Sequence, residues 1–519
     1  MNLFALATIV FSLMLFACSQ TSPKADKVAE SESPMDDMEA NMEERMYEED
    51  PTVIVKGNRF DDFSENPFIE VEKQPVSTFS IDADGASYAI MRRMVNENYD
   101  LQQMSVRIEE LLNYFTFDYP SPTDNNTVAI NAEIGSCPWN ADHKLLRLGI
   151  KGKELKADEV PQANFVFLVD VSGSMGSEDK IDLLKSGLIS LVDHLNPNDR
   201  ISIITYSGEV EKLLESTPVS EKDKIKNAIE KLNTDGFTAG GEALKMAYKE
   251  ALANYNPKYN NRIIMGTDGD FNVGVTDDES LVKMVEEYAS KGIYMTCLGF
   301  GLDNLNDAMM EKISNAGNGN YNYIDSEKEM LKVFVDERER FVSVANDAKC
   351  QVSFDPTMVS QYRLIGYENR ALNNEDFEDD KKDAGEIGAG QTITALYEIV
   401  PTKKFTQSLN NASGEKQVVA TFDFRYKNAL NTSSIPLKKD VTVGDMFSNG
   451  KLLPMSNSMS FAAGIAAYGM LIRESSYKGS ATFKMAYDLV KSSLSYDPHK
   501  YRAEFLSIIK SAMEAETER

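Results

Sequence analysis

Basic residues are under-represented in this chain of 519 residues, which has 54 lysines and arginines against 82 aspartates and glutamates, a formal net charge of −28. Nucleic acids and anionic membrane surfaces are bound through patches of lysine and arginine, so neither is predicted as the main partner. Histidine occurs only three times, and none of the three lies in the polar loops described below. Histidine-based catalysis is therefore poorly supported, whereas cationic ligands, basic protein surfaces and metal ions stay open.

Cysteine is also scarce, with four in the chain: Cys18, Cys137, Cys297 and Cys350. Four cysteines spread over this length do not make the disulfide framework of a small secreted domain. Cys297 lies within the apolar run 293–300 and is predicted to belong to the core. Cys137 and Cys350 flank the central region, and the sequence leaves open whether they pair.

The apolar run at the amino terminus is short. It covers 15 residues, 3–17, whereas a membrane-spanning helix needs about 20, so residues 1–17 are predicted to be a secretory signal peptide. The run ends in Leu15-Phe16-Ala17-Cys18, which resembles the lipobox of bacterial lipoproteins. That resemblance implies lipidation of Cys18 and a lipid anchor on a membrane of the bacterial cell envelope, preferably the outer membrane, facing the periplasm or the cell surface. The alternative is an ordinary cleaved signal followed by an incidental cysteine.

A strongly acidic segment follows the signal. Residues 19–50 include 11 acidic and 3 basic residues and no aliphatic stretch. Such a composition buries too little apolar surface to fold, so residues 18–67 are predicted to carry the lipidated cysteine and a disordered acidic stalk. Four methionines at near-helical spacing in this segment leave a partner-docking helix as the alternative.

The central region, residues 161–340, alternates short apolar runs with amphipathic stretches. Unbroken apolar runs that alternate with helical patterns are typical of a mostly parallel sheet buried on both faces, an α/β doubly wound fold. The predicted strands cover 165–169, 201–206, 262–265, 293–300 and 321–324, and the predicted helices cover 180–195, 222–232, 242–253, 279–291, 305–315 and 328–340. Ligands of such sheets bind at the carboxyl ends of the strands.

Three loops of this region contain oxygen ligands. The first strand runs into Asp170-Val-Ser172-Gly-Ser174, and the strand at 262–265 runs into Asp268, while Thr238 lies in a loop between two predicted helices. Alternate side chains of an extended segment point the same way, so Asp170, Ser172 and Ser174 are expected to converge. Carboxylates and hydroxyls are ligands of hard divalent cations.

These residues, in this order and spacing, resemble the metal-ion-dependent adhesion site of the von Willebrand factor type A (VWA) family. The resemblance implies a parallel sheet wrapped by helices and a divalent cation, Mg²⁺ (or Mn²⁺ or Ca²⁺). It further implies that the hydroxyls bind the ion directly and the two aspartates directly or through water, and that a protein partner contributes a Glu or Asp to the ion. The implied metal ligands are Asp170, Ser172, Ser174, Thr238 and Asp268.

Competing chemistries lack essential residues. A phosphatase of the haloacid dehalogenase type needs a second aspartate where Ser172 stands, and a serine hydrolase needs a histidine base. Gly299-Phe-Gly301 lacks the third glycine of a dinucleotide-binding loop. The chain is therefore not predicted to be an enzyme, although an undetected hydrolase is a third possibility.

The regions on either side of the central domain carry motifs of their own. They resemble the regions that accompany VWA domains in a family of bacterial lipoproteins. Before the central domain, the motifs are Ser-Ile-Asp-Ala-Asp-Gly-Ala-Ser-Tyr from Ser80, Arg-Ile-Glu-Glu-Leu-Leu-Asn-Tyr-Phe from Arg107 and Cys-Pro-Trp-Asn from Cys137. After it, the motif is Ile-Gly-Ala-Gly-Gln-Thr-Ile-Thr-Ala-Leu-Tyr-Glu from Ile387.

The predicted organisation is an N-terminal α+β domain (68–160), the VWA domain (161–340), a β-rich domain (341–450) and a helical C-terminal region (451–519). We further expect strands before residue 151 and after residue 341 to form one sandwich into which the VWA domain is inserted. The predicted function is a lipid-anchored protein that binds a protein partner through a metal-dependent VWA module. The alternative is a structural scaffold of an envelope complex with a non-essential metal site.

Overall fold

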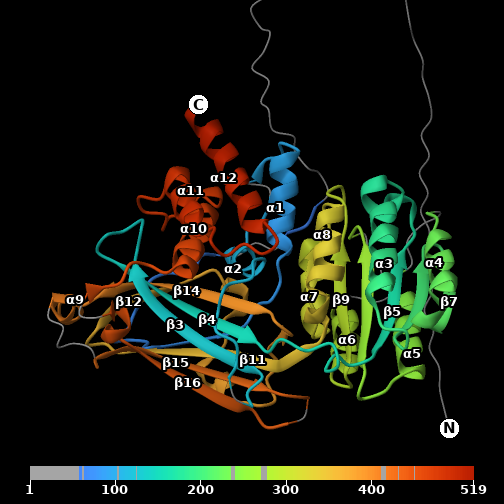
Figure 1. Ribbon diagram of the computed structural model, residues 1–519, viewed down its shortest axis with the longest axis horizontal. Helices are drawn as coiled ribbons and strands as arrows, with labels where there is room; N and C mark the ends of the chain where they lie inside the picture. The colour runs from blue at the N-terminus through green and yellow to red at the C-terminus, as the bar shows by residue number, and fades with distance from the viewer. Residues whose placement is uncertain are drawn as a thin grey trace, which may run out of the picture. The chain divides into compact units, whose positions relative to one another are not determined.

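A computed structural model describes residues 58–60, 64–101, 104–123, 125–234, 240–269, 278–410, 416–430, 432–448 and 451–518. The chain divides into two units, Met1–Pro51 and Thr52–Arg519, and all described residues belong to the second. Within this unit the central region forms one α/β layer structure, and the segments before and after it form a two-sheet sandwich with helices (Figure 1).

The central sheet has six strands in the order β10-β9-β8-β5-β6-β7. All neighbours are parallel except β7, which runs antiparallel to β6 at one edge. The strands are β5 (Ala163–Asp170), β6 (Arg200–Tyr206), β7 (Val210–Pro218), β8 (Asn260–Thr267), β9 (Ile293–Gly299) and β10 (Tyr321–Tyr323). The predicted doubly wound, mostly parallel sheet is therefore confirmed.

Helices cover both faces of this sheet because alternate residues of its strands point to opposite sides. In β5, Val166 and Leu168 belong to one hydrophobic cluster together with residues of α5, α6 and α7. Phe165 and Phe167 belong to another cluster together with residues of α3, α4 and α8. These helices are α3 (Leu183–His194), α4 (Lys222–Glu230), α5 (Gly240–Ala253), α6 (Asp278–Ala289), α7 (Asp307–Ala316) and α8 (Glu327–Leu331).

The sandwich contains strands from both sides of the central domain. One sheet has the order β1-β12-β14-β4-β3, and the other has the order β13-β11-β15-β16 with β2 paired to β11. The strands before the central domain are β1 (Ile69–Glu70), β2 (Val76–Ser80), β3 (Val128–Ser136) and β4 (Lys144–Gly152). Those after it are β11 (Ser343–Phe354), β12 (Val359–Ile365), β13 (Gly385–Gly388), β14 (Thr392–Pro401), β15 (Val418–Lys427) and β16 (Ile435–Thr442).

Two strand pairings establish that the central domain is inserted in this sandwich. β4 pairs with β14 along its length, with Leu146 opposite Tyr397, and β2 pairs with β11, with Phe79 opposite Cys350. The inner faces of the two sheets share one hydrophobic cluster, which includes all four of these residues. The expected joint sandwich is confirmed.

A group of helices packs beside the sandwich. α10 is buried along almost its whole length because its residues are small or apolar on every face. The helices of this group are α1 (Ala86–Asn96), α2 (Ile108–Asn113), α10 (Asn457–Ile472), α11 (Phe483–Ser492) and α12 (Tyr501–Glu518). The fold also includes the short helix α9 (Lys403–Asn410) and a hairpin of β17 (Phe447–Ser448) and β18 (Lys451–Leu452). Among the helices of the described ranges, none combines the length and apolar character needed to span a membrane.

Arg92 joins the helices to the central domain. The guanidinium of this buried α1 residue donates to both carboxylate oxygens of Asp325 at 2.5 and 2.7 Å, and to Glu329 at 2.7 Å. It also donates to Tyr114 at 2.9 Å and to Glu504 of α12 at 3.0 Å. One side chain thus connects α1 and α12 with the loop after β10 and with α8.

Some elements differ from those expected from the sequence. The predicted helix 328–340 consists of α8, a π turn (Lys332–Asp336) and a 3₁₀ turn (Arg338–Phe341). The helical C-terminal region predicted for 451–519 contains α10, α11 and α12. In the central sheet, the edge strand β7 was not predicted. Cys137, Cys297 and Cys350 are buried free thiols, and Cys137 and Cys350 lie in different hydrophobic clusters, so they do not pair.

Candidate metal site at the sheet edge

The polar loops predicted to bind a metal meet at the carboxyl edge of the central sheet. β5 ends at Asp170 and β8 ends at Thr267, and the two strands are parallel neighbours with Val169 opposite Gly266. The loops that follow them therefore emerge side by side. The hydroxyl of Thr267 donates a hydrogen bond of 2.9 Å to Asp170 Oδ2 and so connects the two loops directly.

Asp170 organises the first loop. Its Oδ1 accepts a hydrogen bond of 2.9 Å from the backbone N–H of Ser172, which holds the turn after the strand. The 3₁₀ turn Gly173–Met175 then brings the Ser174 hydroxyl to 3.0 Å from the Ser172 hydroxyl. Asp170 and Ser172 are buried, while Ser174 is exposed, so the two hydroxyls lie between the protein interior and the solvent.

Asp268 lies in the second loop and is buried with one oxygen unsatisfied. Its Oδ1 accepts no hydrogen bond from any described residue. The next residue, Gly269, has a φ of 95° and lies so close to the loop before α7 that an added Cβ would be 2.3 Å from the backbone nitrogen of Asn306. A side chain there would displace the Asp268 loop, so glycine fits this position for steric as well as conformational reasons.

Lys180 is a member of this site that the sequence analysis did not identify. It is only 4% exposed, and its Nζ donates to the backbone carbonyl of Ser174 at 3.0 Å and to Asp268 Oδ2 at 3.1 Å. Its Nζ also lies 3.3 Å from the exposed carboxylate of Asp303. The signal was present in the sequence, because Lys180 stands four residues before Leu184 on the buried stripe of the following helix.

The electrostatics of the site disfavour negative charge in the absence of a cation. Burial raises the pKa of Asp170 to about 6, and the nearby charge of Asp268 also raises it, against the hydrogen bonds donated by Ser172 and Thr267. A buried carboxylate is stable when a cation or hydrogen-bond donors compensate its charge. Two carboxylates, one of which has an unsatisfied buried oxygen, and two converging hydroxyls are donors of the kind that a hard divalent cation takes.

The structure thus brings four of the five predicted metal ligands together: Asp170, Ser172, Ser174 and Asp268. The fifth, Thr238, lies outside the described residues, as does the predicted lipidation site Cys18. Whether these side chains bind a metal stays a prediction at this point.

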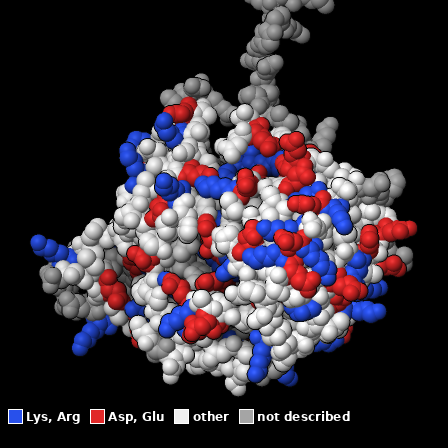
Figure 2. Space-filling model, turned by 45° about the vertical axis from the view of Figure 1, so that its right-hand side comes forward, with Lys and Arg blue, Asp and Glu red and all other residues white. Residues whose placement is uncertain are grey.

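On the face of the molecule drawn in Figure 2, acidic and basic side chains are interspersed. The excess of acidic residues in the chain is therefore not gathered into one patch on this face. Buried carboxylates such as Asp170 and Asp268 account for a part of the acidic content that a surface view does not display.

Three family models match the chain in succession. The model described as von Willebrand factor type A domain matches residues 164–337. The model described as von Willebrand factor matches residues 54–147, and the one described as "Uncharacterized protein YfbK, C-terminal" matches residues 339–515. The matches therefore cover the central domain and both flanking regions.

Relatives extend this similarity over most of the chain. "Uncharacterized protein YfbK" of Escherichia coli K12 is 36% identical over 472 residues, which cover 88% of this chain and 81% of that protein. The inter-alpha-trypsin inhibitor heavy chain H4 of Homo sapiens is 31% identical over 204 residues, 37% of this chain and 21% of that protein. The first relative thus shares the arrangement of all parts, and the second shares a single region.

Solved structures show similarity of lower degree. The structure described as von Willebrand factor type A from Catenulispora acidiphila has 14% identity and a TM-score of 0.41, with 72% of this chain and 88% of that chain covered. The conserved hypothetical protein BatB from Bacteroides thetaiotaomicron has 23% identity and a TM-score of 0.29, with 33% and 95% covered.

Replacement of Lys180 tests its role as the internal counter-ion. We expect Lys180→Met to lower the free energy of unfolding by about 3–5 kcal/mol in chelator, because it leaves the Asp268 carboxylate buried without a cationic partner. The double variant Lys180→Met/Asp268→Asn is expected to recover most of this loss, as measured by urea denaturation.

The matched control is Lys185→Met, in the same helical segment. Lys185 pairs with the exposed Asp182 at 3.7 Å, so its loss is expected to cost at most about 1 kcal/mol. Equal losses in Lys180→Met and Lys185→Met, or no recovery in the double variant, would show that Lys180 does not compensate Asp268.

Proposed function

This chain belongs to the von Willebrand factor type A domain family that includes YfbK of Escherichia coli, and we propose that its central domain binds a protein partner through a divalent cation. The ion is Mg²⁺, with Mn²⁺ or Ca²⁺ as substitutes. The observation that carries the proposal is the buried Asp268 Oδ1, which lacks a hydrogen-bond partner in the described part of the chain beside the paired hydroxyls of Ser172 and Ser174.

Asp170, Ser172, Ser174 and Asp268 would hold the cation, together with Thr238 by the family resemblance. The serine hydroxyls are neutral, so only Asp170 and Asp268 contribute full negative charge. Lys180 compensates part of the Asp268 charge at 3.1 Å. This donor set leaves residual positive charge at the site, which favours an acidic group from outside the chain.

The external ligand is a glutamate or aspartate side chain of a protein partner. Ser174 is exposed at the carboxyl edge of the sheet, so the site is reachable from solvent. A cation bound in part by neutral ligands supplies an open position for such a carboxylate, as open zinc sites do for their substrates.

We assign a binding role to this site and no catalytic one. Acyl transfer by a serine requires a base to accept the hydroxyl proton. The residue that hydrogen-bonds Ser174 is Ser172, and Lys180 donates to the backbone of Ser174 instead of accepting a proton from its side chain. The three histidines of the chain lie elsewhere, and His143 bonds Glu398 of the sandwich at 2.6 Å.

Removal of Asp170 tests for the metal. Burial raises the pKa of Asp170 to about 6 from an ordinary value of 3.8. The Asp170 carboxylate therefore binds a proton more tightly in the folded, ion-free protein than in the unfolded chain. The resulting stabilisation is present at low pH and is lost as the pH rises from 3.8 to about 6. In chelator above pH 6, Asp170→Asn is therefore expected to be at least as stable as the wild type.

In magnesium we expect the wild type to be more stable than Asp170→Asn. At a concentration of 100 times Kd we expect Mg²⁺ to stabilise the wild type by about 2.7 kcal/mol and the variant hardly at all, measured by thermal unfolding and isothermal titration. Asp303→Asn changes an exposed acid beside Lys180 and is expected to behave like the wild type. Equal stabilisation of wild type and Asp170→Asn by Mg²⁺, or none in either, would contradict the metal site.

Partner binding is tested by affinity capture from envelope extracts with the purified wild type as bait. We expect a partner that is retained in Mg²⁺, released by chelator, and missing with the Ser172→Ala/Ser174→Ala bait. Retention that is unaffected by chelator and by these substitutions would favour the alternative, a structural scaffold of an envelope complex with a non-essential metal site.

The proposal also places the protein on a membrane of the cell envelope, preferably the outer membrane, through a lipid on Cys18. Its support is the apolar segment 3–17 that ends in Leu15-Phe16-Ala17-Cys18, followed by the acidic segment 19–50 as a tether. In cells fed an alkyne fatty acid, we expect wild type and Cys137→Ser to be labelled and found in membranes, and Cys18→Ser to be neither. Labelled Cys18→Ser would refute the anchor.

A further inference from the structure

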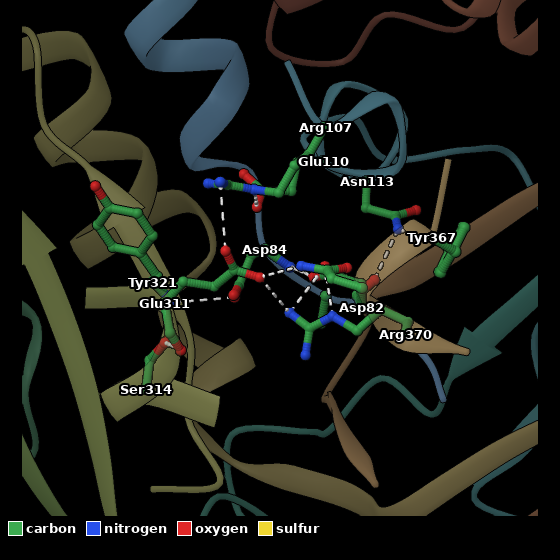
Figure 3. Close-up of polar contacts among 12 residues, drawn as sticks. Asp82, Asp84, Arg107, Glu110, Asn113, Glu311, Ser314, Tyr321, Tyr367 and Arg370 are labelled. Atoms are coloured by element: carbon green, nitrogen blue, oxygen red, sulfur yellow. Dashed lines mark hydrogen bonds and ion pairs between the residues drawn. The ribbon is translucent and has the colours of Figure 1, made fainter. Parts of the chain in front are cut away.

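A second group of carboxylates is buried between the sandwich, the helices and the central domain. Asp82 and Asp84 lie between β2 and α1, Glu110 belongs to α2, and Glu311 belongs to α7. Each is at most 4% exposed. Figure 3 shows these four side chains, which we call the Asp84 cluster, turned toward one another between Arg107 and Arg370.

The oxygens of the cluster are spaced as ligands of one ion would be. Asp82, Glu110 and Glu311 each place one carboxylate oxygen within 4.8 Å of the other two. Oxygens that bind the same calcium ion at 2.3–2.6 Å are at most about 5 Å apart. These three carboxylates are therefore close enough together to share a cation.

The cations of the protein do not balance this cluster. Arg107 donates to both oxygens of Asp307 at 2.7 and 3.0 Å and also bonds Glu110, while Arg370 bonds Asp82 at 2.9 Å and Glu311 at 3.2 Å. Arg107 also lies 3.3 Å from Glu311. Among the described ion pairs, two guanidiniums thus serve Asp307 and three acids of the cluster, and none reaches Asp84. An excess of buried negative charge is costly unless protons or a cation neutralise it.

Asp84 provides the independent sign of a missing ligand. Its Oδ1 accepts hydrogen bonds from the backbone N–H of Tyr321 at 3.0 Å and from Asn320 at 3.3 Å, whereas its buried Oδ2 has no partner among the described residues. Asp84 is adjacent to the other acids, because its backbone N–H donates to Asp82 Oδ1 at 2.9 Å and both residues line one cavity. Burial, and then the charges of Asp82 and Glu110, raise the pKa of Asp84 well above its ordinary value.

A cavity of about 510 Å³ reaches the cluster from outside. Asp82, Asp84, Asn320 and Arg370 line it on the inner side, and Glu286 of α6 lines it on the exposed side. It can admit a hydrated ion and hold the water molecules that complete a coordination shell. Calcium suits this arrangement, because it accepts six to eight oxygens in irregular geometry, whereas Mg²⁺ demands a near-ideal octahedron.

We propose that the Asp84 cluster binds a calcium ion, independently of the VWA site, and that the ion joins the loop before α1, α2 and α7. The ligands come from three segments that are distant in the sequence. The bound ion therefore cross-links the central domain to the regions that flank it. This role differs from that of the VWA site, since the cluster is buried and offers no open face to a protein.

Asp84→Asn is the sharpest test, because its amide group replaces an oxygen that has no hydrogen bond to lose, while Oδ1 is retained. The experiment uses full-length protein carrying Asp170→Ala, so that the VWA site does not contribute. Isothermal titration with CaCl₂ is expected to give one ion per chain in this background, and addition of Asp84→Asn is expected to weaken binding at least tenfold. Glu286→Gln, on the same cavity, is the matched control and should bind as its parent does.

Thermal unfolding provides a second readout. In chelator, the Asp170→Ala/Asp84→Asn protein should have the same melting temperature as the Asp170→Ala protein or a higher one, because one buried negative charge is removed. In calcium, only the Asp170→Ala protein should gain stability. The proposal is overturned if the Asp170→Ala protein binds no calcium, or if Asp84→Asn leaves calcium binding unchanged. Either result concerns the Asp84 cluster alone, since the VWA proposal depends on the separate comparison of wild type with Asp170→Asn in magnesium.

Discussion

The pairing of β4 with β14 is the constraint on which the rest of this structure depends. It joins a strand that precedes the central domain to one that follows it. In the opposite sheet, the pairing of β2 with β11 likewise joins a preceding strand to a following one. Both ends of the central domain are therefore attached to the same sandwich. A domain tethered at one end could rotate about its linker, whereas attachment at both ends restricts such motion.

Buried ion pairs strengthen this arrangement at specific points. Arg92 connects α1 and α12 with Asp325 and Glu329 of the central domain, and Arg107 of the α2 region connects with Asp307 of α7. Each guanidinium distributes several donors over more than one acid, which suits arginine better than lysine. Because loss of one partner leaves uncompensated buried charge, these contacts specify how the parts fit together as well as how firmly they hold.

The two candidate cation sites differ in chemistry for reasons visible in their side chains. The VWA site combines carboxylates with hydroxyls, includes the internal cation of Lys180 and reaches the surface at Ser174. The Asp84 cluster has no hydroxyl among its four acids, is paired with Arg107 and Arg370, and is buried. The first arrangement is suited to an ion that shares an external ligand, and the second to an ion that holds the protein together. One segment borders both sites, since the loop before α7 lies against Gly269 and Glu311 of α7 belongs to the cluster.

Much of the architecture could be predicted because the strands of a parallel sheet buried on both faces are continuous apolar runs. β5, with all eight residues buried, is the clearest example. Edge strands lack this signal: β7 exposes Glu211, Lys212 and Glu215, and β16 alternates charged with partly buried residues. Their strand character comes from hydrogen bonds to β6 and β15, which no local pattern of apolar residues reveals.

The sequence by itself determined the fold class of the central domain and the spacing of Asp170, Ser172 and Ser174, because both are local: strand periodicity and a short turn after a buried strand. Tertiary structure decided what those residues meet. It placed Lys180 on Asp268 and brought Asp82, Glu110 and Glu311 within reach of one another. Electrostatic energy depends on distance in space, and the folding of distant segments onto one another sets those distances.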